Sequence, residues 1–443
     1  MHDNRSRHIG FCLALWVLWP ANLEAQDDAT KTGLLRKDEG AAPGFTLFSP
    51  SGGSNTYLID LDGELVHSWN SDSSGGSNYL LEDGSLLRRE ETGNPGFRSG
   101  GAGGRISRYA WDSTLLWRFE ISDDDRIQHH DLEPLPNGNI LALCWERKSR
   151  DQAIAAGRDP ERLPDDGMWL EYVVELRPQG EDRAEKIWEW HLWDHLVQNL
   201  DEDQSNYGTI SEHPRRVDLN FAANQSADWI HANGLAYSSV LDQIVISARR
   251  FSEVWVIDHG TTSSTAAGPA GDLLYRWGNP MTYGRGGEED QRLFLQHDAR
   301  WIEAGSPGAG NLMVFNNGQR RGRPYSSADE WVPPIDERGR YSLDSEAAFG
   351  PQAAYWSYST GDESFYSSFI SGAHRLPNGN TMICSGTQSR IFEVTRDGTV
   401  VWDYVSGFSR QPPSDSGGGP PPTGIFRATR YPPTYPGLAR LRR

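Results

Sequence analysis

A two-strand unit with tryptophan near its end recurs along this chain and restricts the folds open to it. Each copy has an apolar run, a polar turn and a second run, as in TYLIDLDGELVHSW (56–69) and RIFEVTRDGTVVWDY (390–404). Other copies lie at 105–119, 172–190 and 254–278, and AAYWSYS (353–359) is a weaker one. Alternating apolar residues around such turns are typical of β-hairpins, so the chain is predicted to be all-β.

Strand-like patterns of a second kind alternate with these units, at 79–89, 130–145, 231–250, 297–315 and 374–387. Six Trp-ended units against five of the second kind leave one hairpin missing. GIFRATRYPPTYPGLARL (424–441) can supply it beside the first unit. We therefore predict a six-bladed β-propeller closed by the N- and C-terminal segments, with the tryptophans packed between blades.

Long insertions interrupt the pattern at about 147–170, 192–228, 280–295 and 318–350. In a propeller they are expected to cover one face and line a pocket. The stretch 187–200 is expected to pass from a strand into a short helix, which spaces His191 and His195 as i and i+4. Because no HExxH-type glutamate lies between them, we expect no metal at this pair.

The ends of the chain and its composition bound its location and its partners. A basic start, an apolar run from Ile9 to Ala21 and the string LEA predict a signal peptide at 1–25, hence a periplasmic or secreted protein with no membrane segment after cleavage. Residues 26–43 are expected to be a linker, and 44–443 the propeller domain.

With 42 Lys and Arg against 61 Asp and Glu, the net charge of −19 argues against nucleic acid or anionic lipid as the main partner. Cys144 and Cys384 lie in apolar runs and are expected to be buried free thiols.

Histidines recur at one point of the repeat. His130, His231, His297 and His374 each precede the strand-like run of a hairpin, so propeller symmetry would bring them to the same radius around the central channel. A single histidine in such a place is usually a packing residue, but four in register favour a site. His374, with no carboxylate or Asn beside it, is the weakest candidate.

The strings around these histidines resemble those of a known family, the bacterial arylsulfate sulfotransferases. They are DWIHANG (228–234), ISARRFSEVWVID (246–258), QHD at 296–298 and HHD at 129–131, and the resemblance extends from about Gly44 to Tyr404. Family members are PAPS-independent enzymes on a six-bladed propeller. The resemblance implies that His297 is the nucleophile and that His130, His231 and Arg249 line the sulfuryl site.

The same resemblance implies the reaction. A sulfuryl group would move from an aryl sulfate ester to a phenolic or other hydroxyl acceptor, by a ping-pong mechanism through sulfohistidine, with no cofactor and no metal. Neutral imidazole is a competent nucleophile near pH 7, and the planar Arg249 guanidinium matches sulfate oxygens. His130 or His231 can donate hydrogen bonds or protonate the departing phenolate. Because adjacent strand residues point to opposite faces, the partner that orients His297 is expected to be a backbone carbonyl or a residue of another blade, rather than Asp298.

Two other functions stay open at this point. The same histidines could be the ligands of a metal-dependent hydrolase or lyase, or the propeller could bind a glycan or protein without catalysis. Arg249 favours the sulfotransferase over the metal enzyme, because a guanidinium beside a divalent cation is unfavourable. The resemblance would also imply an N-terminal dimerisation domain, but only about 18 residues (26–43) lie between the expected signal peptide and the propeller. It would imply a close cysteine pair as well, whereas Cys144 and Cys384 lie far apart in the sequence. The sequence leaves the oligomeric state, the donor, the acceptor and the choice between transfer and hydrolysis open.

Overall fold

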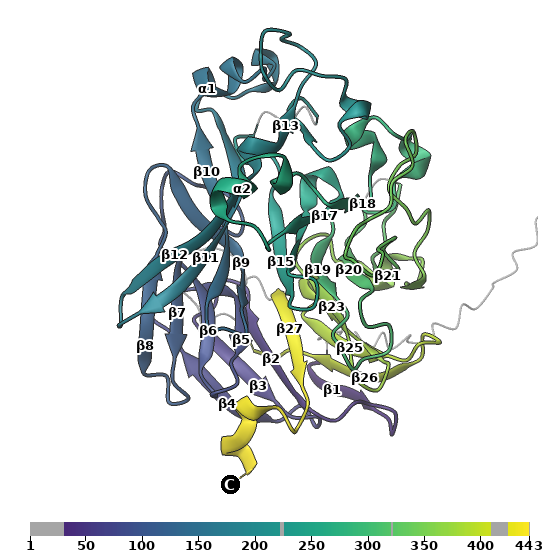
Figure 1. Ribbon diagram of the computed structural model, residues 1–443. Helices are drawn as coiled ribbons and strands as arrows, with labels where there is room; N and C mark the ends of the chain where they lie inside the picture. Colours follow the sequence, from purple (N-terminus) through teal and green to yellow (C-terminus); the bar gives the residue numbers. More distant parts are fainter. Residues whose placement is uncertain (1–30, 222–225, 320–321, 409–423, 443) are drawn as a thin grey trace, which may run out of the picture. The chain divides into compact units, whose positions relative to one another are not determined.

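Six antiparallel sheets form the β-propeller that the repeat predicts (Figure 1). The computed structural model describes residues 31–221, 226–319, 322–408 and 424–442, and Thr32–Arg443 form one compact unit. The predicted signal peptide, 1–25, lies outside the described residues. The first strand of each blade contacts the first strands of both neighbouring blades, so these six strands surround the centre.

Each blade has four strands that follow the repeat, to which blade 6 adds a fifth, and the first strand of each set lies nearest the centre. Blade 1 contains β27 (Ile425–Tyr431), β2 (Phe45–Pro50), β3 (Asn55–Ile59) and β4 (Leu65–Asn70); blade 2 contains β5 (Gly75–Leu80), β6 (Leu86–Glu91), β7 (Gly104–Tyr109) and β8 (Leu115–Glu120). Blade 3 contains β9 (Arg126–Pro134), β10 (Ile140–Lys148), β11 (Met168–Gln179) and β12 (Arg183–His191); blade 4 contains β15 (Ala232–Ser238), β16 (Gln243–Ala248), β17 (Glu253–Asp258) and β18 (Tyr275–Trp277). Blade 5 contains β19 (His297–Trp301), β20 (Leu312–Asn316), β21 (Ser327–Trp331) and β22 (Trp356–Tyr358); blade 6 contains β23 (Gly372–Arg375), β24 (Thr381–Ser385), β25 (Arg390–Val394) and β26 (Val400–Val405).

Both ends of the described chain pair with strands far away in the sequence. The C-terminal strand β27 lies beside β2, with Phe45 opposite Tyr431, which confirms the predicted closure (Figure 1). Near the N-terminus, β1 (Gly33–Lys37) adds a fifth strand to blade 6 by pairing with β26. Part of the segment expected as a linker, 26–43, is therefore a strand of the propeller.

The tryptophans of the repeat join neighbouring blades, as predicted. Five of them donate an indole hydrogen bond to a strand or an internal loop of the next blade: Trp117 to the Arg183 carbonyl, Trp188 to Thr261 Oγ1, Trp277 to the Pro351 carbonyl, Trp356 to the Arg396 carbonyl and Trp402 to the Leu61 carbonyl. The sixth, Trp69, packs edge-on against Trp111 of blade 2 at 5.2 Å between ring centroids. Each blade is thereby held to the next by one large, buried or partly buried ring.

The insertions carry most of the remaining elements. Residues 147–170 hold α1 (Arg150–Ala155) and 192–228 hold the two-stranded sheet of β13 (Leu196–Val197) and β14 (Val217–Asp218), while α2 (Ser263–Ala266) lies between β17 and β18. The expected helix near 187–200 is a single 3₁₀ turn, Leu192–His195. The stretch 318–350 is more than an insertion, because it contains β21, whose polar SADEW sequence hid a buried strand. No helix within the described ranges is long and apolar enough to cross a bilayer.

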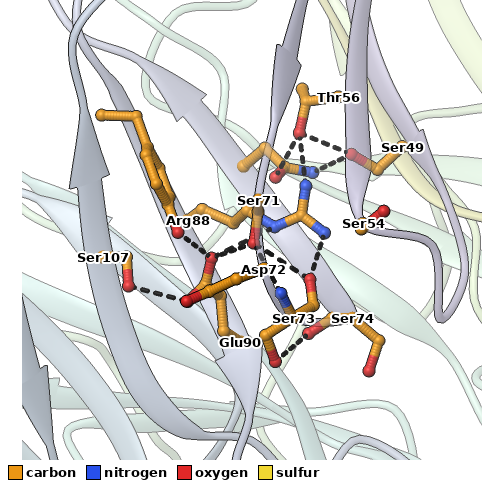
Figure 2. A network of polar contacts seen from close by, with 12 residues as sticks. Ser49, Ser54, Thr56, Ser71, Asp72, Ser73, Ser74, Arg88, Glu90 and Ser107 are labelled. Carbon is orange, nitrogen blue, oxygen red and sulfur yellow. Dashed lines mark hydrogen bonds and ion pairs between the residues drawn. The ribbon is translucent and has the colours of Figure 1, made fainter. Parts of the chain in front are cut away.

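A polar network fixes the boundary between blades 1 and 2 (Figure 2). Arg88 on β6, 1% exposed, donates to Thr56 Oγ1 at 2.8 Å and to the Gly53 carbonyl, and Glu90 accepts from Ser71 and Ser107. Burial lowers the pKa of Arg88 to about 10, so the side chain remains charged at neutral pH. This network anchors the loop before β5, the strand that supports the site described below.

Candidate active site

Three of the four repeated histidines sit at irregular points of the inner strands. His130 lies within β9, His231 directly precedes β15 and His297 begins β19. The pairing register of each of these strands shifts there, and His130, His231 and Asp298 have left-handed φ angles of 47°, 54° and 59°. Such bulges redirect side chains relative to a regular strand. They aim the imidazoles in ways that the alternation of a regular strand does not allow.

His130 and His231 are neighbours, and His129 supports the first of them. The ring centroids of His130 and His231 lie 4.6 Å apart in an edge-to-face arrangement. The Nδ1 atoms of His129 and His130 are 2.8 Å apart, so one of them donates a hydrogen bond to the other. His129 also stacks on Trp145 at 3.9 Å. Burial first, and then the adjacent imidazoles, hold the pKa of His130 well below its usual value, so this ring is neutral at pH 7.

Asp228 orients His231. Its Oδ2 atom accepts from His231 Nδ1 at 2.5 Å and from Ser99 Oγ at 2.5 Å, and it lies 3.5 Å from Nη2 of Arg250. Asp228 is only 2% exposed. Burial opposes its ionisation, but the hydrogen bond with His231 and the charges of His231 and Arg250 outweigh burial and lower the pKa of Asp228. A carboxylate fixed on Nδ1 leaves Nε2 of His231 as the nitrogen available for proton transfer.

Asn317, directly after β20, sets the tautomer of His297. Its Nδ2 donates to the carbonyls of Ser367 at 2.7 Å and Ile370 at 3.0 Å, so its Oδ1 faces His297 Nδ1 at 2.7 Å. Nδ1 therefore carries the proton, and Nε2 accepts from the Ile370 N–H at 3.1 Å. Burial first, then the charge of Arg249, holds the pKa of His297 well below its usual range. The orienting group is a side chain of the same blade, not the backbone carbonyl or residue of another blade that strand geometry predicted.

Arg249 is the candidate cation of the site. It follows β16 in a 3₁₀ turn, Arg249–Phe251, so one strand, a turn and a second strand separate it from His231, as the spacing predicts. Its guanidinium makes no hydrogen bond or ion pair with any residue that the structure describes, and its Nε is buried. Burial lowers the pKa of Arg249, with Arg250 adding to the effect. A partly buried guanidinium with unused donors can receive an anion.

The other candidates of the repeat lie apart from this group. His374 on β23 accepts from the Arg430 N–H at 3.3 Å and makes no described hydrogen bond or ring contact with His130, His231 or His297. Asp131 and Asp298 turn away from the adjacent rings and pair with Arg427 on β27.

His191 and His195 also have separate partners. His191 lies 3.2 Å from Glu146, and His195 lies 2.9 Å from Asp272. Across the described parts of the chain, no group of three or more His, Cys, Asp or Glu residues is placed to hold a metal ion. Cys144 and Cys384 are buried free thiols, as predicted.

The sequence did not predict the roles of three residues at or beside the site. Asp228 was visible in DWIHANG, three positions before His231, but only the bulge brings its carboxylate onto Nδ1. Asn317 belongs to FNNG, which reads as a plain turn, and Arg427 lies 130 positions beyond His297 on the closing strand. Neither of these two carries a local signal.

Comparison with known proteins gives one family and a set of distant folds. The family model described as "Arylsulfotransferase (ASST)" matches residues 31–401. No curated protein matches the chain. Among solved structures, a protein of unknown function from Bacteroides caccae is 13% identical, with a TM-score of 0.46 over 88% of this chain and 99% of its own. A streptogramin B lyase is 10% identical, with a TM-score of 0.39 over 86% of this chain and 87% of its own. Likenesses this distant have no bearing on the site.

Proposed function

The chain belongs to the arylsulfotransferase family and is a transferase, and on that premise we propose that it moves a sulfuryl group from an aryl sulfate ester to a hydroxyl acceptor in two steps, through a sulfohistidine at His297. The observation that carries the proposal is the tautomer of His297. Asn317 holds the proton on Nδ1, which leaves a lone pair on Nε2 of a ring that is neutral at pH 7. This is the form of imidazole that can attack sulfur.

In the first step, the Nε2 lone pair bonds to sulfur and the bond from sulfur to the aryl oxygen breaks. The phenolate departs with the bonding electrons and takes a proton from an acid. The Nε2 atom must first lose its hydrogen bond with the Ile370 N–H, and the freed amide then lies beside the attacking nitrogen, where it can donate to a sulfuryl oxygen. Sulfuryl transfer resembles phosphoryl transfer, with a loose transition state whose charge spreads over three oxygens. The uncommitted guanidinium of Arg249 suits that charge and offsets the net −19 of the chain locally.

His231 is the better candidate for the acid. The Asp228 carboxylate fixes the His231 ring through Nδ1 and leaves Nε2 for proton transfer, whereas burial and neighbouring imidazoles keep His130 neutral. In the second step, the oxygen of the acceptor hydroxyl attacks sulfur while His231 takes the proton of that hydroxyl. The bond between sulfur and Nε2 of His297 breaks, and His297 returns to its starting form. His130, 4.6 Å from His231 between ring centroids, is proposed to donate a hydrogen bond to a sulfuryl oxygen.

The test uses p-nitrophenyl sulfate, with and without phenol and with EDTA. Release of p-nitrophenolate that depends on phenol, survives EDTA and yields phenyl sulfate supports transfer. Release that needs no acceptor and stops with EDTA would instead support a metal-dependent hydrolase. A quench at alkaline pH without acceptor, followed by peptide mass spectrometry, locates the sulfuryl group, because an N-sulfo bond is expected to be acid-labile.

A further inference from the structure

Arg427 ties together the two aspartates that follow proposed catalytic histidines. It lies on β27, the strand that closes the ring, and its side chain is 6% exposed. Its two Nη atoms meet the two oxygens of Asp131 at 3.1 and 2.7 Å, and its Nε lies 2.9 Å from Oδ1 of Asp298. One guanidinium on blade 1 thus spans carboxylates of blades 3 and 5.

These aspartates belong to the bulges that aim the histidines. Asp131 follows His130, and Asp298 follows His297. The left-handed φ angles of 47° at His130 and 59° at Asp298 are costly for residues other than glycine and persist only where surrounding contacts enforce them. Arg427 supplies such contacts to both bulges at once.

The residues around Arg427, Asp131 and Asp298, which we call the hub, leave these three side chains little freedom to rearrange. Tyr79 Oη donates to Asp131 Oδ1 at 2.9 Å and accepts from Arg427 at 2.9 Å, while Arg300 pairs with Asp298 at 2.5 Å. A Cβ at Gly372 on β23 would come within 2.2 Å of Asp298 Oδ2, so glycine is required there. Without Arg427, Asp131 would keep no cationic partner among the residues that the structure describes.

From these contacts we infer that Arg427 is a positioning residue of the active site, which sets the placement of His130 relative to His297 by holding Asp131 and Asp298. The inference rests on the proposed function for its effect on rate, but its geometric content is independent of it. Lysine keeps the charge but offers one point of contact, so it cannot bind Asp131 with two parallel hydrogen bonds and reach Asp298 as well.

The experiment compares Arg427→Lys with a matched control, Arg430→Lys. Arg430 lies on the same strand, is buried, and pairs with Glu393 at 3.0 Å, but touches neither histidine bulge. In Arg427→Lys, kcat with p-nitrophenyl sulfate and phenol should fall on the order of 100-fold with little change in KM, as expected when reacting groups are displaced by about 1 Å. Arg430→Lys should keep wild-type kcat, even where its melting temperature falls as far.

A second readout does not depend on activity. In spectra of the protein labelled at histidine ring nitrogens, the resonances of His130 and His297 should move in Arg427→Lys and stay in place in Arg430→Lys. Unmoved resonances, or equal kcat in the two variants, would overturn the inference, whereas an inactive wild type would overturn only the proposed function. If Arg427→Lys does not fold, Tyr79→Phe removes one hydroxyl of the hub and should shift the same resonances and lower kcat about tenfold, the effect of one hydrogen bond. Unchanged spectra and rate in that variant would also reject the inference.

Discussion

Oδ1 of Asn317 lies 2.7 Å from Nδ1 of His297, while both donated hydrogen bonds of Asn317 go to backbone carbonyls. This amide cannot turn without losing two hydrogen bonds, so it presents an acceptor to His297 and holds the imidazole in a single tautomer. Position 317 therefore acts on the proposed nucleophile through a neutral group, which leaves the ring uncharged.

Replacing Asn317 by Asp tests this relationship through pH. A carboxylate beside Nδ1 stabilises the imidazolium, so it raises the pKa of His297. Wild-type kcat should stay constant down to well below pH 6.5, because the low pKa of His297 keeps the ring neutral there. In Asn317→Asp, the acid limb of the rate profile should move to higher pH, since a protonated Nε2 has no lone pair. Stopped assays from pH 5 to 9 measure the shift, and an unmoved limb would mean that His297 is not the nucleophile.

His297→Asn should abolish both the covalent adduct and transfer, by about a thousandfold or more, as loss of a nucleophile does in other enzymes. The melting temperature is the control, because it separates loss of the nucleophile from loss of the folded structure. Peptide mass spectrometry after incubation with donor alone is the measurement. An adduct found on His130 or His231, or full transfer by the variant, would show that the nucleophile has been assigned wrongly.

Arg249→Lys should lower kcat by about 100-fold or more, since a point charge cannot reproduce the planar fork on sulfate oxygens. Arg249→Met should lose still more activity without losing stability, because no described ion pair is broken. Arg276→Met is the matched comparison: Arg276 is fully buried and pairs with Glu253, so its loss should cost about 3–5 kcal/mol of unfolding free energy. Urea unfolding and steady-state rates separate the two cases, and a strong loss of stability in Arg249→Met would contradict the proposed role of Arg249.

Asp228→Asn should impair proton transfer from His231, because the ring loses the carboxylate that orients it, and the effect should depend on the leaving group. Phenyl sulfate, whose phenolate needs a proton, should react far more slowly, on the order of 100-fold, while p-nitrophenyl sulfate should lose much less. Kinetics over a series of substituted phenyl sulfates give this slope directly. Equal losses across the series would indicate that His231 does not protonate the leaving group.

The same carboxylate predicts a dependence of stability on pH. The pKa of Asp228 is lower in the folded protein than in the unfolded chain. Its contribution to stability is therefore complete above about pH 4 and is lost as the pH falls through the lower folded value. Asp228→Asn should flatten the acid side of the urea-unfolding profile below pH 4 and leave the neutral region parallel to the wild type. An unchanged acid side would argue that Asp228 is not ionised against His231.

The number of blades, their closure and the residue types of the site follow from the sequence. Hairpins that carry tryptophan at the same position can all bury its indole ring when they pack against one another in the same repeated arrangement. Six such units and one missing hairpin therefore predict a propeller that is closed by β27. The sequence does not predict the strands β1 and β21, which are short and carry charged residues, and they take their conformation from the neighbours β26 and β20 with which they pair.

Tertiary structure alone decided how the site is arranged. A regular strand sends adjacent side chains to opposite faces, and that rule correctly set Asp298 aside but could not locate Asn317, because the bulge at His297 changes which neighbouring atoms the ring meets. The pairing of Asp228 with His231 likewise depends on backbone angles. The contacts of Arg427 with blades 3 and 5 depend on distances across the propeller. Hydrophobic patterning does not reveal the bulge that brings Asp228 onto His231, and it does not place Arg427, since closure of the propeller brings together strands that lie far apart along the chain.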